Sequence, residues 1–318
     1  MAYRKDNLSK VKKIYTEKRA KALGEAKARL DDMHRQYPDL AGIDSALAET
    51  GMRLVEAISI GADGITERVA AIRRDNEKLQ EDRAELLAFY GYPTDYTDVH
   101  YECSLCEDTG YEGTVMCACM KRTLSMLALE SAGLAPLAKK QRFDTFSLSF
   151  YQGDDRVTME KNFEICRDYA DGFTLGSESL LFLGKTGLGK THLSTSIAVA
   201  VIEKGYDVVY ASAPSLFLSL EAEKFGREAD IPLKEVEEAD LLILDDLGSE
   251  NQSPLHVNFL YQVINARMVK GRPTIINTNL SVREIKERYT DRVASRLLGE
   301  YLVLGFVGRD VRMQKIGL

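Results

Sequence analysis

The sequence predicts an α/β protein in which a parallel sheet with helices on both faces follows a helical region and a small cysteine-rich module. Three observations lead to this prediction. Short apolar runs alternate with helix-like segments after residue 150, the order that produces a parallel sheet. A glycine-rich turn joins the first of these runs to a helical segment. Two pairs of cysteines precede them, after a long stretch of helix-forming composition.

Size and charge set the first limits. A chain of 318 residues has room for two or three domains at roughly 150 residues each. The net charge of −7 argues against a protein that coats nucleic acid with its whole surface, although residues 3–29 are strongly basic. We find no secretory leader pattern and no apolar run of membrane-spanning length, so we expect a cytoplasmic protein without a membrane partner.

Residues 1–95 are predicted to be helical. We expect a basic helix over Ser9–Tyr37 that ends at Pro38, and a second helix over Asp44–Ile60 that is interrupted by glycines at 61–64. A seam with spacings of four and three then follows, made of Ile65, Val69, Ile72, Asn76, Leu79, Arg83, Leu86 and Tyr90. The seam fits a self-packed helical hairpin, which we favour, and also a docking arm for a partner protein.

Residues 96–122 form the predicted cysteine module. Cys103 and Cys106 are followed by Cys117 and Cys119, with a glycine-containing turn between the two pairs. Two such pairs converge readily on one tetrahedral ion, and we expect Zn²⁺ in a structural site. Disulfides are disfavoured in a reducing compartment, and the spacing matches no ferredoxin pattern. Cys166, far from the pairs, is expected to be a small buried apolar residue.

Residues 123–150 are predicted to be a linker, with a helix and then an extended segment that brings Phe143 and Phe146 against the next domain. That domain, residues 151–318, begins with a helix near Val157–Tyr169. The apolar runs that we predict as its strands are Leu180–Leu183, Val208–Ser212, Leu241–Leu244, Thr274–Asn277 and Tyr301–Gly305.

The glycine-rich turn has the pattern of a phosphate-binding P-loop. Glycines allow backbone N–H groups to converge on one anion, and the helix that begins near Thr191 adds its positive end. The lysine reaches the β- and γ-phosphates and the threonine hydroxyl reaches Mg²⁺. The sequence therefore predicts ATP and Mg²⁺ as ligands, held by Gly184, Gly187, Leu188, Gly189, Lys190 and Thr191.

Acidic and amide side chains end two of the later strands. Asp245 and Asp246 follow the apolar run Leu241–Leu244, where ligands of open α/β sheets bind. We expect Asp245 to hold Mg²⁺ and Asp246 to orient or deprotonate the attacking water. After the next strand, Asn279 is chosen over Asn277 as the residue that contacts the γ-phosphate or the water.

Three arginines complete the candidate catalytic set. Arg292 and Arg296 share one face of a predicted helix, from which an arginine reaches the nucleotide of a neighbouring subunit. Arg312 is placed to contact the phosphates of its own subunit. A surface salt bridge is the plainer interpretation of each arginine taken alone.

Taken together, these motifs resemble the AAA+ ATPases of the bacterial helicase-loader family, the DnaC and DnaI type, with the transposition helper IstB as close kin. The resemblance covers most of residues 144–318 and rests on the segments 184–191, 241–248, 271–274, 278–280 and 292–297. It implies that Lys190 and Thr191 belong to Walker A and that Asp245 and Asp246 form Walker B. It further implies that Asn279 is sensor 1, Arg296 the arginine finger and Arg312 sensor 2.

The resemblance also implies a function. A loader of this family places a DnaB-type replicative helicase on single-stranded DNA, using ATP as a switch, and assembles as a homo-oligomer. Asp246 stands where the broader AAA+ pattern has a glutamate, so we expect slow hydrolysis. An insertion-like helical stretch, 212–238, would bring Lys224 and Arg227 to single-stranded DNA, although glutamates adjoin them.

Two other functions stay open at this point. An IstB-like helper ATPase acts on duplex DNA for a transposase and needs no zinc arm. A nucleotide-binding adaptor with little turnover would use the cysteine module for recognition. A generic P-loop kinase fits less well, because no lid-like run of arginines follows the P-loop.

Overall fold

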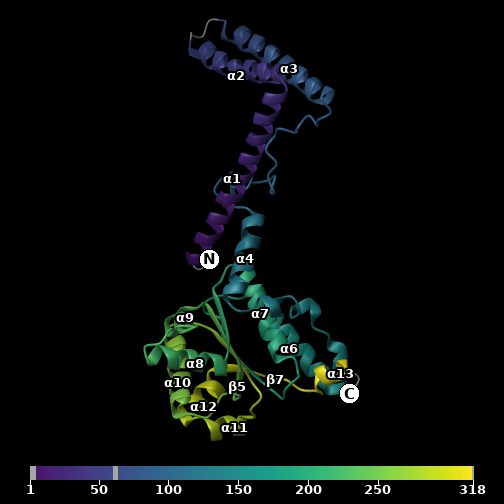
Figure 1. Cartoon of the computed structure of the whole chain (residues 1–318). Coiled ribbons are helices and arrows are strands. Elements are labelled where there is room, and N and C mark those ends of the chain that lie inside the picture. The colour runs from purple at the N-terminus through teal and green to yellow at the C-terminus, as the bar shows by residue number, and fades with distance from the viewer. Residues whose placement is uncertain (1–4, 60–63, 317–318) are drawn as a thin grey trace. The chain divides into compact units, whose positions relative to one another are not determined.

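The computed structural model describes residues 5–59 and 64–316, which divide into two compact units. One unit contains residues 12–117, and the other contains residues 1–11 and 118–318. Figure 1 shows the helices of the first unit and the sheet of the second. Within the described ranges, no helix is long and apolar enough to cross a membrane.

The first unit is built on α1 (Lys5–Gln36), most of which it contains, α2 (Pro38–Ser59) and α3 (Ile65–Phe89). The predicted first break is present, but Pro38 also begins the second helix, six residues earlier than expected. Proline is well tolerated in the first turn of a helix, where its missing N–H group is not needed. The expected break at residues 61–63 lies outside the described residues.

The seam of α3 faces α2. All eight seam residues are buried or half-buried, which agrees with a helical hairpin. Its two polar members have partners across the hairpin: the Asn76 amide donates to the Thr50 hydroxyl at 2.7 Å, and Arg83 donates to Asp44 at 2.6 Å. At the end of the hairpin, Met33, Leu40 and Leu87 form a small core with the surrounding tyrosines.

The second unit contains a five-stranded parallel sheet in the order β4-β5-β6-β3-β7. The bounds are β3 (Ser179–Leu183), β4 (Val208–Ser212), β5 (Leu241–Leu247), β6 (Thr274–Thr278) and β7 (Tyr301–Gly305). The predicted α/β class and its five strands are confirmed. The strand that carries the acidic motif is longer than predicted, because β5 continues past Leu244 to Leu247 through an irregularity in its pairing with β6.

Helices cover both faces of this sheet (Figure 1). On one face lie α4 (Ala118–Ser131), α5 (Ala135–Ala138), α6 (Gly153–Asp171) and α7 (Lys190–Glu203). On the other lie α8 (Ala213–Lys224), α9 (Leu233–Glu238), α10 (Pro254–Val269), α11 (Val282–Arg288) and α12 (Asp291–Gly299). Successive residues of a strand point to opposite faces of the sheet. Phe182 and Ile243 pack towards α7, and Leu242 and Leu244 pack towards α10.

The remaining elements are short. The predicted extended segment before the sheet instead forms two 3-10 turns, η1 (Phe143–Thr145) and η2 (Leu148–Phe150), and α13 (Val311–Lys315) follows the last strand. Phe143 and Phe146 pack on Phe163 of α6 with ring centroids 5.8 and 5.6 Å apart, as expected of an aromatic pair. Cys166 is fully buried, as predicted, and its burial raises the pKa of the thiol.

A buried arginine joins α10 to α9 and to the start of the central strand β6. Arg267 is 0% exposed and donates to the carbonyls of Val236, Ala239 and Pro273 and to the Thr274 hydroxyl. Burial lowers the pKa of this guanidinium to about 10. Its hydrogen bonds satisfy the carbonyl groups at the end of α9, which need a donor in a buried setting.

Candidate functional site

A cavity of about 680 Å³ lies at the carboxyl ends of the strands in the second unit. Its walls come from the loop between β3 and α7, the ends of β5 and β6, α13, and the segment from Leu137 to Tyr151. Ligands of open parallel sheets bind at this edge. The cavity is the candidate nucleotide site.

The glycines of the loop are required by close packing. At Gly187, φ is +81° and an added Cβ would stand 2.0 Å from a carboxylate oxygen of Asp310. At Gly189, φ is +92° and a Cβ would stand 2.9 Å from Phe146 and Tyr151. The Tyr151 hydroxyl also donates to the Leu188 carbonyl at 3.0 Å. The loop is therefore held from outside by α13 and the aromatic segment, with no room for side chains.

Lys190 is buried at the floor of the cavity. Its ammonium donates to the carbonyls of Gly184 and Lys185 at 2.6 and 2.8 Å and to Asn279 Oδ1 at 2.6 Å. Burial lowers the pKa of Lys190 to about 8, although Asp245 and Asp246 act in the opposite direction. All three acceptors are neutral, so an anion of high charge is the complementary ligand for this ammonium.

Asp245 is held on several sides. Its carboxylate accepts from the Thr191 hydroxyl at 3.1 Å, from the Tyr210 hydroxyl at 2.5 Å and from the Asn277 amide at 2.8 Å. Burial, with the nearby Asp245 charge, raises the pKa of Tyr210, so this hydroxyl stays a donor. A fixed carboxylate next to a hydroxyl suits Mg²⁺, which prefers hard oxygen ligands in strict geometry.

Asp246 lies at the exposed end of β5 in a left-handed conformation with φ +58°. Its carboxylate accepts from the Asn279 amide at 2.8 Å. Asn279 therefore joins Lys190 to Asp246, and all three line the cavity. Asn277 lies behind Asp245 instead, is fully buried, and its own Oδ1 has no partner among the described residues.

Arg296 and Arg312, the two of the three arginines with an implied family role, occupy different places. Arg312 of α13 lines the cavity. Arg296 does not line it; its guanidinium donates to Asn265 at 3.0 Å and lies 4.8 Å from the centre of the Tyr261 ring. The structure thus places Arg312 at the cavity of its own chain. It places Arg296 outside this cavity, where α12 meets α10.

Part of the cavity wall is aromatic. Phe146 and His192 meet there edge to face with centroids 5.2 Å apart, and Gln141 lies among the other lining residues. Burial lowers the pKa of His192, which keeps the ring neutral. A flat, neutral, apolar group fits against these rings, while the P-loop suits phosphate.

The four cysteines lie close together. Their Sγ atoms are all within 4.8 Å of one another, and those of Cys103 and Cys117 are 3.9 Å apart. Tetrahedral Zn–S bonds of about 2.3 Å place the sulfur atoms about 3.8 Å apart. The set therefore fits a thiolate-bound Zn²⁺, which would supply a structural cross-link.

Local hydrogen bonds shape the cysteine segment. The buried Asp108, with φ +55°, accepts from the backbone N–H groups of Glu102 and Cys103 at 2.9 Å each. Between the cysteine pairs, β1 (Tyr111–Glu112) and β2 (Val115–Met116) form a short antiparallel hairpin. Asp108 was not recognised from the sequence; an aspartate two residues after a cysteine pair is the signal that indicates it.

The expected DNA-contacting stretch is α8 and the loop that follows. Lys224 lies 5.8 Å from the centre of the Phe259 ring, and Arg227 lies 6.0 Å from that of Phe225. Glu221 contacts His256 at 3.0 Å, and Glu223 accepts from the Leu233 N–H group. Two of the adjoining acids are thus engaged within the unit.

Tyr210 and Tyr151 are the site residues that sequence reasoning missed. Tyr210 is a half-buried polar side chain in the middle of strand β4, which neighbours β5. That position is a weak signal. Tyr151 lies in an irregular segment whose contact with the P-loop depends on the packing of the whole unit.

Comparison with known proteins agrees with this geometry. The sequence profile of the family described as IstB-like ATP binding protein matches residues 130–303. An ATP-binding protein of insertion sequence IS232 from Bacillus thuringiensis subsp. berliner is 30% identical over 142 residues, which are 43% of this chain and 56% of that protein. The match therefore spans little more than half the length of that relative.

Two further similarities concern DnaC proteins. The replicative helicase loader DnaC of Escherichia coli (strain K12) is 23% identical over 213 residues, 65% of this chain and 84% of the loader. A crystal structure of the DnaC helicase loader covers 54% of this chain and 99% of its own, with 25% identity and a TM-score of 0.48. The strand order of the sheet and the family match together assign the fold.

Proposed function

Since this chain belongs to the IstB-like ATP-binding family, with a matched region that includes the whole P-loop and both strand-end motifs, we propose that it is a helicase loader. In this proposal it binds ATP with Mg²⁺, hydrolyses it slowly, and places a DnaB-type replicative helicase on single-stranded DNA. The observation that carries the ATPase part is the convergence of Lys190, Asp245, Asp246 and Asn279 on one cavity.

The proposed chemistry follows from these contacts. Lys190 exchanges its neutral acceptors for phosphate oxygens, which releases Asn279 Oδ1. Thr191 and Asp245 would hold Mg²⁺, which would supply charge neutralisation at the phosphates. Asp246 accepts the proton of the attacking water, and Asn279 orients that carboxylate. The short side chain of Asp246 supports slow turnover.

The proposed partner follows from the part of the chain outside the family match. The α2–α3 hairpin and the four-cysteine segment precede residue 130, and the loader DnaC is among the relatives. On α2, Met52 and Val55 are 66% and 67% exposed, so apolar area is available for a helical partner. We propose that this hairpin binds the helicase.

Co-purification with a DnaB-type helicase tests whether the α2–α3 hairpin binds the helicase while the other unit binds ATP. The full chain carrying Met52→Asp and Val55→Asp should lose helicase capture and keep ATP binding. Val157→Asp is the matched control, because Val157 is 68% exposed on α6 of the other unit. Capture that survives the α2 changes would contradict the proposed docking role.

We also propose that the protein assembles through its ATPase unit and that Arg296 acts on the nucleotide of a neighbouring subunit. Its position outside the cavity of its own chain supports this role. Mixing Arg296→Ala protein with Lys190→Ala protein should then give more ATPase activity than either alone. An Arg296→Ala protein with the activity of the unaltered protein would contradict the proposal.

A second candidate function has specific support. The IS232 relative is more identical to this chain than DnaC is, so a transposition helper acting on duplex DNA is the alternative. ATP-dependent filaments on duplex DNA, formed without a helicase, would favour it. Helicase loading by the Lys190→Ala protein would instead favour an adaptor that needs no turnover.

A further inference from the structure

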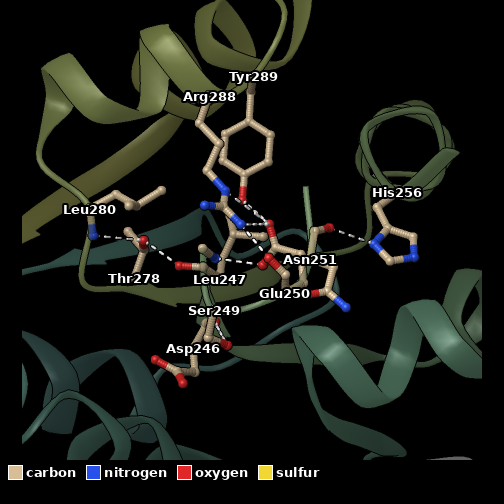
Figure 2. A network of polar contacts seen from close by, with 11 residues as sticks. Asp246, Leu247, Ser249, Glu250, Asn251, His256, Thr278, Leu280, Arg288 and Tyr289 are labelled. Carbon is tan, nitrogen blue, oxygen red and sulfur yellow. Dashed lines mark hydrogen bonds and ion pairs between the residues drawn. The ribbon is translucent and has the colours of Figure 1, made fainter. Parts of the chain in front are cut away.

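A buried carboxylate fastens the loop that follows β5. Glu250 is 5% exposed, and Figure 2 shows its side chain between that loop and the end of α11. Its Oε1 accepts from the Tyr289 hydroxyl at 2.6 Å and from Arg288 at 3.3 Å. Its Oε2 accepts from the Gly248 N–H group at 2.7 Å. One oxygen thus faces α11 and the other faces the loop.

Several other bonds hold the same turn. The Asp246 carbonyl accepts from the Ser249 N–H group at 3.1 Å and from its hydroxyl at 2.7 Å. The Leu247 carbonyl accepts from the Thr278 hydroxyl at 2.6 Å. Arg288 also donates to the Glu250 carbonyl (Figure 2). Each residue from 246 to 248 therefore has a backbone group that is hydrogen-bonded to a side chain, of Ser249, Thr278 and Glu250 respectively.

The turn needs such fixing because of Asp246. Its φ of +58° lies in the left-handed region, which residues other than glycine adopt at an energetic cost. Such a conformation persists only where surrounding contacts determine it. The same conformation directs the Asp246 carboxylate to Asn279 in the cavity. A loose loop would release both the backbone and the carboxylate.

We propose that Glu250 is a positioning residue that sets the catalytic geometry of Asp246. It acts through the backbone of residues 246–248 and touches neither nucleotide nor water. The inference rests on the proposed ATPase function, because it gives Asp246 a role in hydrolysis. It concerns the turnover step alone, since Lys190 is assigned to phosphate and Thr191 to Mg²⁺ and neither belongs to this loop.

The hydrogen bonds around Glu250 also link two regions of the ATPase unit. Arg288 and Tyr289 end α11, and α12 with Arg296 begins two residues later at Asp291. On the other side of Glu250, the Asn251 carbonyl lies 3.0 Å from His256, whose second ring nitrogen lies 3.0 Å from Glu221 of α8. The loop that follows β5 therefore contacts elements beyond the nucleotide cavity.

Glu250→Gln in the full chain tests the proposal. It keeps the shape of the side chain but turns one acceptor oxygen into an amide donor that faces other donors. We expect kcat for ATP hydrolysis to fall about 10- to 100-fold, the cost of a displacement near 1 Å at a catalytic group. Affinity and binding stoichiometry for Mg²⁺ with AMP-PNP, measured by calorimetry, should stay within about twofold because the binding residues are untouched.

Two further variants sharpen the result. Tyr289→Phe removes one hydroxyl donor and should lower kcat about three- to tenfold, in line with one lost hydrogen bond. It decides the question if Glu250→Gln does not fold. Glu284→Gln is the matched control: Glu284 belongs to the same helix, accepts from the Ser281 N–H group and, among the described residues, has no hydrogen bond or ion pair to the loop. Its kcat should not change.

Amide hydrogen exchange gives a readout that does not depend on activity. Exchange of residues 246–251 should be faster in Glu250→Gln and unchanged in Glu284→Gln. An unchanged kcat in both Glu250→Gln and Tyr289→Phe would overturn the proposal. A loss of AMP-PNP binding stoichiometry that parallels the loss of kcat would overturn it as well. Unaltered protein that binds ATP without hydrolysing it would also overturn it, whereas failed helicase capture with these kcat effects intact would refute only the loader function.

Discussion

The buried position of Lys190 makes ATP affinity depend on pH. Its pKa is lowered to about 8 in the free protein, mainly by burial, and phosphate binds the charged ammonium. At pH 7 about nine-tenths of the molecules carry that charge, and at pH 9 about one-tenth do. Because binding requires the protonated form, affinity is lost as pH rises through the pKa. We expect the Kd for Mg²⁺ with AMP-PNP to rise about tenfold between pH 7 and pH 9, or about 1.4 kcal/mol.

Isothermal titration calorimetry at constant ionic strength measures this change. At pH 9 the heat in buffers of different ionisation enthalpy should also reveal the uptake of nearly one proton, whereas uptake at pH 7 should be small. Lys190→Arg is the control, because a guanidinium stays charged throughout and its affinity should hardly vary with pH. A flat Kd for the unaltered protein, or proton release at pH 9, would refute the reasoning.

Three further predictions concern the site, the cysteines and the core. Tyr210→Phe removes a donor to Asp245, so the Mg²⁺ concentration for half-maximal ATPase activity should rise about three- to tenfold, as a magnesium titration would show. The purified protein should hold one Zn²⁺ for its one four-cysteine set by elemental analysis, and Cys117→Ser should lower both metal content and thermal stability. Arg267→Met leaves the Val236 and Ala239 carbonyls without this donor, and urea unfolding should show a loss of about 3 kcal/mol.

Each of these has a matched comparison. Tyr206→Phe should leave the magnesium titration unchanged, because Tyr206 does not line the cavity. Cys166→Ser changes a cysteine outside the cluster and should keep the metal. Arg272→Met removes a partly exposed ion pair with Asp240 and should cost no more than about 1 kcal/mol. Equal effects in the test and comparison proteins would contradict the structural reasons given.

Local patterns were sufficient to predict the main elements of the fold. The five apolar runs became the five strands, because a parallel strand covered on both faces needs nearly continuous apolar residues. The seam from Ile65 to Tyr90 likewise marks the buried side of α3. The extension of β5 past Leu244 was not predicted, since its last residues pair with β6 only after an irregularity that the sequence does not mark.

The supporting residues of the site were harder to predict. Tyr210 precedes its partner Asp245 by 35 residues, and Glu250 precedes Tyr289 by 39. Such pairs arise only once strand order and helix placement are known, and no local spacing specifies them. The roles of Asp246, Asn279, Arg296 and Arg312 are predictions from the sequence. The Glu250→Gln kinetics test the role of Asp246, and the Arg296→Ala mixing experiment tests that of Arg296.

The packing of Asp310 against the P-loop has a consequence for biosynthesis. The Val311 N–H group donates to the Gly187 carbonyl, and Arg312 and Lys315 complete the cavity wall. A ribosome that has made β3 and α7 has therefore produced a phosphate loop with one side still open. Translation must pass residue 315 before the nucleotide has a complete pocket, so ATP cannot assist the folding of shorter nascent chains in the way it stabilises the finished protein.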